Sequence, residues 1–461
     1  MIIKYENVPH SVIRIANFCK EAGGKMMVVG GWVRDQLLGI DCKDCDVEVY
    51  GIQPDDLMQL IRSHGFEFQE AGLSFGVLKI KGEDIDVSIP RRENKAGLGH
   101  RGFEILSDPT MTVADAARRR DFTINSMAYD PLEDQLIDPF GGVSDLENHI
   151  LRHTSDAFTE DPLRVLRGMQ FIARFNLTPD PMTVILCRTL NMDELSRERV
   201  YDEWVKLITK GVKISKGLNF LLDTTWIKYF PELYALVGLP QDPEWHPEGD
   251  VFTHTSLSMD AFAEIRDMKE QWDQIVTGFA VLCHDFGKVT TTEQTNGRIT
   301  SKRHESEGEG PTRSFLGRMI ESNNQKKPSE LIEQVVALVI NHMAPTNFYK
   351  QGADNSAVRR LAERVGRIDL LLNVSRCDKM GRGSLKYEPW AEVWLEKKAD
   401  DVQVLDSKPK PIILGRHLID RGMTPGPCFK EFLEAAYEDQ MDGKFIDEES
   451  AMKYLDALIP E

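Results

Sequence analysis

The sequence MMVVGGWVRDQLLGIDCKDCDVEVY, residues 26–50, decides how the N-terminal part of the chain folds. The apolar run at 26–29 predicts a strand that ends at two glycines. The residues WVRDQLLG at 32–39 predict a short helix. The stretch DCDVEVY at 44–50 alternates polar and apolar side chains, which is typical of a strand with one buried face. The segment therefore predicts a strand, a glycine turn, a helix and a second strand in succession.

Two acidic side chains of the second predicted strand are candidate metal ligands. Asp44 and Asp46 are two residues apart, so both carboxylates project from the same face of a strand. Carboxylate oxygens are ligands that Mg²⁺ prefers. Magnesium held there would activate a 3′-hydroxyl and offset charge on the α-phosphate and pyrophosphate of a nucleotide. The alternative for this pair of acids is a solvated strand edge.

The glycine pair upstream of these acids is a candidate phosphate-binding turn. Gly30 and Gly31 end the first predicted strand and open the helix that carries Arg34. Glycines let backbone N–H groups approach a phosphate closely, and the positive end of a helix dipole favours the anion. We therefore expect nucleotide phosphates to bind at this turn.

A second polar cluster lies in RRDFTIN at 119–125. Arg120, Asp121 and Asn125 combine a guanidinium, a carboxylate and an amide, which together can bind a triphosphate and sugar hydroxyls. The alternative for the basic run at 118–120 is a solvated helix surface.

The segment TEDPLRVLRGMQFIARF at 159–175 predicts a helix capped by Asp161. Asp161 and Arg164 would then lie one turn apart, with Arg167 close to the same stripe. A carboxylate and a guanidinium together match the amino donor and ring-nitrogen acceptor that cytosine and adenine share. Uracil and guanine would leave buried groups unpaired, at a cost of about 1–3 kcal/mol each. The alternative is an ordinary surface salt bridge.

These motifs together resemble those of the tRNA nucleotidyltransferase and poly(A) polymerase superfamily. GGWVRDQLLG followed by DCDVEV resembles its signature, RRDFTIN its second motif, and EDPLRVLR at 160–167 its amino-acid template for nucleotides. The resemblance implies a bacterial CCA-adding enzyme of class II, with tRNA, CTP and ATP as partners. It also implies that Asp44, Asp46 and Asp86 are catalytic and that the transferase site uses Mg²⁺.

Two further features bear on the product. Gln170 departs from the family pattern, since relatives often carry an arginine there, and this affects one expected nucleotide contact. The glycine-rich RRENKAGLGHRGF at 91–103 resembles the mobile loop of enzymes that add the complete CCA. It favours CCA addition over CC-only addition or polyadenylation, which remain alternatives of the same chemistry.

A second candidate site follows in the C-terminal half. LCHDFGK at 282–288 places His284 and Asp285 side by side, so that one divalent ion can meet a nitrogen and an oxygen ligand. His254 and Asp378 would complete a four-ligand set with positions left for water and phosphate. For each of these histidines taken alone, the alternative is a structural role without a metal. The remaining candidates, for a second metal or for the phosphate, are His304 and His342.

This ordered set, with Lys288 after the His-Asp pair, resembles the HD phosphohydrolase superfamily. The resemblance implies metal-dependent 2′,3′-cyclic phosphodiesterase, 2′-nucleotidase and phosphatase activities in the branch fused to CCA-adding enzymes. We expect a divalent transition metal here, since His/Asp sites accept several such ions. An alternative of another class is a phosphohydrolase whose transferase head is vestigial.

The predicted fold class is an α/β nucleotidyltransferase head followed by an all-α neck and body, an all-α HD domain and a helical tail. With 461 residues, the chain is too long for one core. Pro- and Gly-rich breaks at 236–250 and 406–415 help to set the boundaries. The expected domains are residues 1–142 for the head, 143–240 for the neck and body, 241–405 for the HD domain and 406–461 for the tail.

Composition narrows the classes of function. The net charge of −18 argues against a nonspecific nucleic-acid binder, although the basic run at 118–120 permits a local RNA track. No apolar run approaches the roughly 20 residues that cross a bilayer, so we expect no membrane partner. The N-terminal MIIKYENVPHS lacks a signal-peptide pattern, and seven scattered cysteines fit a reducing compartment. We therefore expect a cytoplasmic protein.

Overall fold

A seven-stranded sheet forms the centre of the N-terminal part, in the order β3-β4-β5-β2-β1-β8-β9. The strand β1, Lys25–Val29, pairs antiparallel with β2, Cys45–Tyr50, and with β8, Ala128–Asp130. β2 also pairs with β5, Ile85–Ser88, and this pairing is parallel. The other strands of the sheet are β3 Phe68–Ala71, β4 Val77–Ile80 and β9 Gln135–Ile137.

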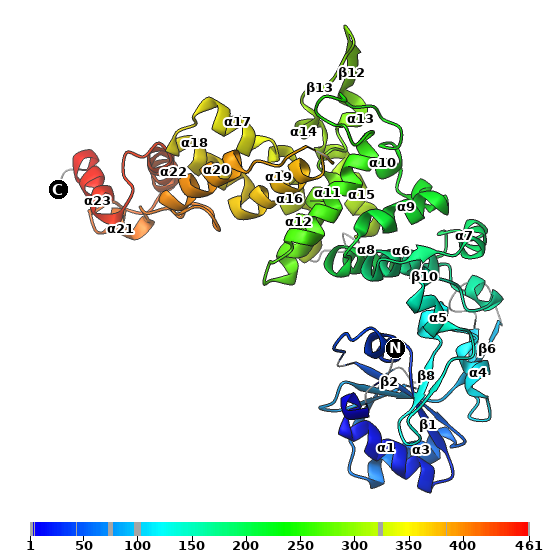
Figure 1. The fold of residues 1–461 in the computed structure, drawn as a ribbon. Helices are drawn as coiled ribbons and strands as arrows, with labels where there is room; N and C mark the ends of the chain where they lie inside the picture. The colour runs from blue at the N-terminus through cyan, green and yellow to red at the C-terminus, as the bar shows by residue number, and fades with distance from the viewer. Residues whose placement is uncertain are drawn as a thin grey trace. The chain divides into compact units, whose positions relative to one another are not determined.

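In this computed structural model the chain divides into two compact units. Unit 1 contains residues 1–207 and 216–229, and unit 2 contains residues 208–215 and 230–461. The residues that the structure describes are 3, 5–42, 44–71, 77–95, 103–320, 326–383 and 385–459. Figure 1 shows α1 and α3 against the sheet in unit 1 and the predominantly helical composition of unit 2.

The strand, turn, helix and strand predicted from residues 26–50 are present. The helix α2 spans Gly31–Leu37 and buries Trp32 and Val33, which fix it against the protein core. The hairpin of β4 and β5 is present as well. The strands β6, Arg91–Lys95, and β7, Phe103–Ser107, pair antiparallel, and residues 96–102 of the glycine-rich segment lie outside the described part. Further helices of the head are α1 His10–Glu21, α3 Pro54–Ser63 and α4 Val113–Ala117.

Helices dominate unit 1 after the sheet. The main one, α6, spans Leu163–Phe175 and packs apolar residues such as Leu166 and Met169 inward. The helix begins at Leu163, and Asp161 lies just before it with extended backbone angles, as a capping residue does. The Asp161 carboxylate accepts a hydrogen bond from the Leu163 N–H at 3.0 Å. The neighbouring elements are α5 Gly142–Glu147, α7 Pro181–Arg188, α8 Arg197–Lys210, α9 Ile214–Asp223 and the short parallel pair β10 Ile150–Leu151 and β11 Thr178–Pro179.

Unit 2 is built on packed helices, and its core includes α11 Val251–Ile265, α12 Gln271–Cys283, α16 Lys326–Asn341 and α19 Ile368–Met380. One feature was not anticipated, namely the hairpin of β12 Thr292–Thr295 and β13 Arg298–Ser301. Asn296 and Gly297 form its turn with φ angles of 52° and 78°, as a tight hairpin turn requires. The other helices before the tail are α10 Pro231–Tyr234, α13 Lys288–Thr291, α14 His304–Glu307, α15 Glu309–Met319, α17 Ala344–Gln351, α18 Asn355–Val365 and α20 Trp390–Asp401.

The C-terminal segment forms the expected helical tail. Its helices are α21 Gly415–Ile419, α22 Pro427–Met441 and α23 Glu448–Leu458. They enclose a small apolar cluster of their own, which includes Leu418, Phe445 and Leu455.

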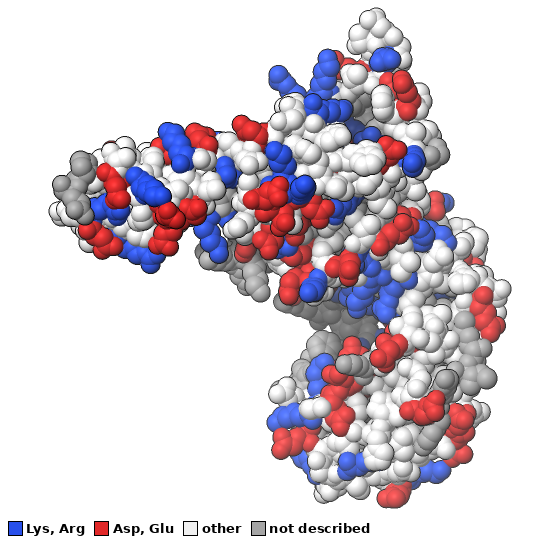
Figure 2. Space-filling model, turned by 60° about the vertical axis from the view of Figure 1, so that its left-hand side comes forward, with Lys and Arg blue, Asp and Glu red and all other residues white. Residues whose placement is uncertain are grey.

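The surface carries both signs of charge in groups. Figure 2 shows clusters of Lys and Arg on one face of the molecule beside clusters of Asp and Glu. The negative net charge therefore leaves room for local basic surfaces. Among the described helices, none combines the length and the apolar character that a membrane span needs.

Candidate functional site

Three predicted catalytic acids lie on neighbouring strands of the unit 1 sheet. Asp44 directly precedes β2 and Asp46 lies within it, and both are exposed while the alternate residues Cys45 and Val47 are buried. Asp86 in β5 is the register partner of Asp46. Register partners in a sheet project to the same face, so the pairing places a third carboxylate beside the first two.

The charges of these acids affect each other. Partial loss of water around its carboxylate raises the pKa of Asp46. The nearby carboxylates of Asp86, Asp44 and Glu48 raise this pKa further, whereas the positive charge of Arg120 lowers it. Lys79 offsets part of the negative charge, since its Nζ is 3.0 Å from Asp86 Oδ2. Three carboxylates gathered on one face of a sheet form an oxygen donor set that fits a hard divalent cation.

Gly30 brings the glycine turn against this cluster. Its φ of 72° is one that L-residues rarely adopt. A Cβ at this position would lie 2.6 Å from Arg120 Nη1 and 4.0 Å from Asp46 Oδ2. Arg120 in turn donates to Glu48 Oε1 at 2.8 Å and to the Asn125 carbonyl oxygen at 3.4 Å. The turn therefore requires glycine for close approach, and Gly31 next to it begins α2.

The other predicted nucleotide-binding residues form one connected polar network. Arg167 in α6 contacts Asp121, with Nε and Nη2 each 2.7 Å from Oδ2. The other carboxylate oxygen of Asp121 accepts from Asn125 Nδ2 at 3.0 Å. Asn125 Oδ1 accepts from Arg34 Nη1 at 2.5 Å. Three motifs that are far apart in the sequence are thus joined by hydrogen bonds.

Two residues that the sequence analysis did not select extend this network. Asp35 accepts from Arg34 Nε at 2.8 Å and lies 3.4 Å from Arg174 Nη2. The guanidinium carbons of Arg34 and Arg174 lie 4.6 Å and 4.7 Å from the ring centroid of Phe175. Asp35 is part of the GGWVRDQLLG motif, but only the fold shows its arginine partner in α6.

Asp161 and Arg164 are held by other partners. Asp161 Oδ2 is 2.7 Å from Arg199 Nη2 in α8. Arg164 donates to the backbone carbonyls of Ala157 and Arg119 at 2.6 Å and 2.7 Å. Both side chains are half-buried, so each remains partly open to a ligand.

Gln170, the departure from the family pattern, is buried in α6. Its side chain is 3% exposed, and its Oε1 has no hydrogen-bond partner among the described residues.

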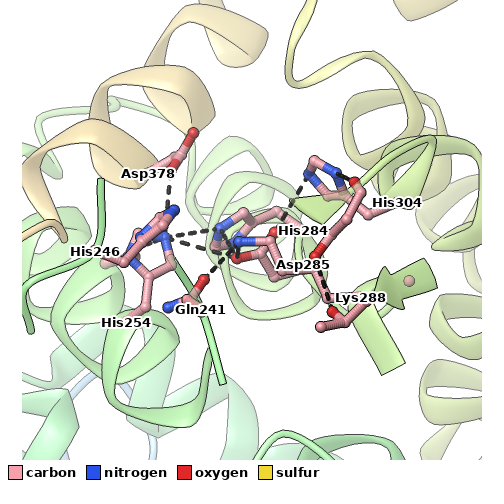
Figure 3. A network of polar contacts seen from close by, with 12 residues as sticks. Gln241, His246, His254, His284, Asp285, Lys288, His304 and Asp378 are labelled. Atoms are coloured by element: carbon pink, nitrogen blue, oxygen red, sulfur yellow. Dashed lines mark hydrogen bonds and ion pairs between the residues drawn. The ribbon is translucent and has the colours of Figure 1, made fainter. Parts of the chain in front are cut away.

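In unit 2, the four predicted metal ligands converge from three places in the chain. His254 comes from α11, Asp378 from α19, and His284 and Asp285 follow the end of α12. His254 Nε2 is 3.2 Å from Asp378 Oδ1 and 3.3 Å from His284 Nε2. Asp285 Oδ2 is 3.3 Å from His284 Nε2 and 3.7 Å from His254 Nε2. Figure 3 shows this convergence, with Asp285 at the centre.

The two additional histidines meet the other side of Asp285. His304 Nε2 is 3.4 Å from Asp285 Oδ1 and 3.1 Å from His342 Nε2. These three residues also form a group whose ligand atoms are close enough to hold one ion. Asp285 therefore offers one oxygen to each of two histidine pairs.

Hydrogen bonds at the opposite ring nitrogens fix the tautomers. The Nδ1 atoms of His284, His304 and His342 each lie 2.7–2.8 Å from a backbone carbonyl oxygen, which only accepts. His254 Nδ1 lies 2.7 Å from a carboxylate oxygen of Glu248. Nδ1 therefore carries the hydrogen in the neutral rings and Nε2 a lone pair. Lone pairs that face one another across about 3 Å repel, so this donor set fits a cation.

The charge states suit metal ligation too. Although burial opposes it, the neighbouring side chains of His284 and Lys288 hold the pKa of Asp285 well below its usual range. Burial, together with His304 and His284, lowers the pKa of His342 to about 3, which keeps this ring neutral. Metal ligands must be deprotonated, and the lowered pKa values of Asp285 and His342 favour that form, whereas Asp378 and Glu248 raise the pKa of His254 against the effect of burial.

Sequence reasoning missed the residues that hold the ligands in place. Glu248 Oε1 contacts both His254 Nδ1 and, at 2.9 Å, His246 Nδ1. Lys288 Nζ lies 2.7 Å from both Asp285 Oδ2 and Gln241 Oε1. His246 and Glu248 lie in WHPEGD at 245–250, but nothing in their spacing to His254 predicts a contact.

A cavity of about 340 Å³ opens over the unit 2 cluster. Its lining includes Asp285, His304 and Asp378, together with Trp245 and several cationic side chains. The cluster is therefore accessible to a ligand.

Known proteins resemble this chain in both sequence and fold. Residues 26–152 match the Poly A polymerase head domain. A multifunctional CCA protein of Xylella fastidiosa is 37% identical over 306 residues, which cover 64% of this chain and 70% of the relative. One from Laribacter hongkongensis is 33% identical over 384 residues, which cover 81% and 89%. A CCA-adding enzyme of Thermotoga maritima, solved in complex with tRNA, shares the fold with a TM-score of 0.59, 22% identity and coverage of 98% and 97%.

The sheet with its acidic face and glycine turn, followed by a largely helical body, defines a nucleotidyltransferase. More specifically, the chain belongs to the family of multifunctional CCA proteins.

Proposed function

We propose that this chain adds cytidine, cytidine and adenosine to the 3′ end of tRNA, using CTP and ATP and no nucleic-acid template. The observation that carries the proposal is the placement of Asp46 opposite Asp86, with Asp44 exposed beside them and Gly30 next to Asp46. The names of the relatives and the tRNA complex of the Thermotoga maritima enzyme support the choice of product and partner.

Different residues of the unit 1 site would bind the metal and the triphosphate. Asp44, Asp46 and Asp86 would hold Mg²⁺, which supplies activation of the 3′-hydroxyl and neutralisation of phosphate charge. At the glycine turn the Gly31 N–H would bind a triphosphate oxygen, whereas the Gly30 N–H donates to the Met127 carbonyl oxygen at 3.3 Å, so Gly30 serves the close approach of the backbone. Arg120, fixed by Glu48, places a positive charge at the same face.

We assign the choice of nucleotide to three residues at or just before the start of α6. Asp161, Arg164 and Arg167 present one carboxylate and two guanidinium groups to the base edge. Hydrogen bonds and ion pairs hold these side chains before a nucleotide arrives, and such preorganisation lowers the entropic cost of binding. The network through Asp121, Asn125 and Arg34 then connects base selection to the phosphate-binding turn.

For unit 2 we propose a metal-dependent phosphohydrolase site. His254, His284, Asp285 and Asp378 would hold a divalent transition metal, which supplies an activated water for attack on phosphorus. His304 and His342 would hold a second ion through the other oxygen of Asp285, or the substrate phosphate. Lys288 and Arg382, which contact Asp285 and Asp378, supply positive charge beside the phosphate.

The four-part division at residues 142, 240 and 405 belongs to the proposal. Head and neck both lie in unit 1 up to residue 207, and the HD domain and tail both lie in unit 2. The neck and body at 143–240 cross between the units, because residues 208–215 and 230–240 lie in unit 2, so the proposed boundary at 240 differs from the division into compact units.

The product is tested by incubating the purified chain with tRNA transcripts that end before CCA and supplying each labelled nucleotide in turn. Addition of two cytidines and then one adenosine supports the proposal. An adenosine ladder would identify a poly(A) polymerase, and addition that stops after two cytidines would identify a CC-adding enzyme. No addition, with phosphohydrolysis retained, would identify a hydrolase with a vestigial head.

A further inference from the structure

Trp245 is an exposed aromatic side chain at the cavity over the unit 2 cluster. It is 56% exposed and lines the same cavity as Asp285 and Asp378. Among the described residues, its indole has neither a hydrogen bond nor a ring partner. Tryptophan has an apolar surface large enough that exposure beside a polar site indicates contact with a ligand.

The loop that carries Trp245 is ordered by hydrogen bonds. The N–H groups of Trp245 and His246 donate to the Asp242 carbonyl oxygen at 3.1 Å and 2.9 Å, and the Glu244 N–H donates to the Asp242 side chain at 3.0 Å. The next residues join the metal-ligand set, since Glu248 contacts both His246 and His254. The backbone that carries the indole is therefore held at a defined position relative to the ligands.

The charges of the cavity lining fit a phosphate. Lys288, Lys350, Lys379 and Arg382 all line it. Lys379 is neutralised by Glu392 at 2.7 Å, and Lys288 and Arg382 contact the ligand carboxylates. Lys350 is exposed and has no ion pair within the described part of the chain. The cavity thus combines a flat apolar surface, which suits a nucleobase, with an available cation and a metal-ligand cluster, which suit a phosphate.

We propose that Trp245 stacks on the nucleobase of the substrate whose phosphate ester is cleaved at the unit 2 cluster. Trp245 is thus a specificity-determining residue that distinguishes nucleotides from other phosphate esters. The cavity of about 340 Å³ is at the small end of the usual range for ligand sites, which suits a single nucleotide. In the reaction, a water oxygen bonds to phosphorus, the ester bond to the ribose oxygen breaks, and that oxygen leaves with a proton. The inference rests on the proposed phosphohydrolase function.

The experiment compares two substrates that share a secondary phosphate ester but differ in the base, namely 2′-AMP and glycerol 2-phosphate. Phosphate release is measured for the full-length wild type, Trp245→Ala and Trp245→Phe, with the divalent metal that best supports the wild type. The matched control is Trp390→Ala, because Trp390 is also exposed, at 63%, but does not line the cavity. Bound metal is measured for every variant.

Trp245→Ala is expected to raise KM for 2′-AMP by roughly tenfold or more, as loss of one base stack predicts. Its kcat, its bound metal and its hydrolysis of glycerol 2-phosphate should stay within about twofold of wild type, and Trp245→Phe should recover most of the loss. An equal loss on both substrates, or no loss on 2′-AMP, would overturn the role of Trp245. A wild type that hydrolyses neither substrate would instead refute the phosphohydrolase function itself.

Discussion

The guanidinium of Arg167 and the carboxylate of Asp121 form a two-contact ion pair, with Nε and Nη2 both 2.7 Å from Oδ2. This pair joins α6, which carries the proposed base-reading residues, to the RRDFTIN motif. Through Asn125 and Arg34 the connection continues to the helix that follows the glycine turn. The residues proposed to select the base and those proposed to bind the phosphates therefore share one hydrogen-bonded network.

The first prediction concerns the pH dependence of stability. Although burial opposes it, Arg167 and Asn125 hold the pKa of Asp121 below its ordinary value. A depressed carboxylate pKa contributes stability that is complete above the unfolded value of about 3.9 and is lost as the pH falls through the folded value. Asp121→Asn should therefore lower the free energy of unfolding by about 1–3 kcal/mol at pH 7 and by less at pH 3.

The free energy of unfolding is measured for wild type and variant by urea titration at pH 7, 5 and 3, with tryptophan fluorescence from unit 1 as the signal. The matched control is Asp134→Asn, which removes a carboxylate that accepts a hydrogen bond from the Tyr129 hydroxyl at 2.6 Å and has no arginine partner among the described residues. An Asp121→Asn cost that is the same at pH 7 and pH 3 would contradict the assignment.

The second prediction concerns close approach at the glycine turn. Gly30→Ala places a methyl group 2.6 Å from Arg120 Nη1 at a φ of 72°, so Arg120 must move away from Glu48 and Asp46. Gly39→Ala is the matched control, since its φ of 70° causes similar strain with nothing within 4 Å. We expect nucleotide incorporation to fall roughly tenfold to a hundredfold in Gly30→Ala only. Equal losses in both variants would mean that backbone strain alone matters.

The third prediction concerns base choice. Asp161→Ala should reduce the preference for CTP and ATP over UTP and GTP by roughly tenfold or more, because the base edge loses its acceptor. Arg199→Met is the control, since it removes the partner of Asp161 and leaves the carboxylate in place. Competition between labelled nucleotides on one tRNA transcript measures the preference. Retained selectivity in Asp161→Ala would refute the template role.

The fourth prediction separates the two sites. His284→Ala should lower phosphate ester hydrolysis and bound metal by at least about a hundredfold, because one ligand of the unit 2 cluster is lost. Nucleotide incorporation should be unchanged, because the acidic cluster lies in unit 1. Loss of both activities together would show that the partition into two sites is wrong.

Local patterns predicted the elements that carry the site. The alternation in DCDVEVY predicted β2, because a strand with one buried face alternates polar and apolar residues. The glycine pair predicted the turn before α2, because a positive φ favours glycine. The hairpin of β12 and β13 also had a local signal, the Asn296-Gly297 pair typical of tight hairpin turns, but the sequence analysis did not predict it.

Contacts between distant segments could not be predicted in the same way. Arg120 meets Glu48, 72 positions away, and Arg174 meets Asp35, 139 positions away. Glu248 could be found near His254, but its role in holding two rings depends on how the loop folds back on α11. The order of the metal ligands was visible in the sequence, whereas the residues that orient them became visible only in the fold.

The central claim is that Asp44 and Asp46 support nucleotide addition to tRNA, and one measurement tests it most directly. Wild type and the Asp44→Asn, Asp46→Asn double variant are incubated with tRNA transcripts that lack CCA and with labelled CTP and ATP. Phosphate ester hydrolysis by unit 2 serves as the control for folding. We predict that the wild type completes CCA and that the double variant loses incorporation by about a thousandfold or more with hydrolysis intact. Incorporation by the double variant within tenfold of wild type would contradict the account.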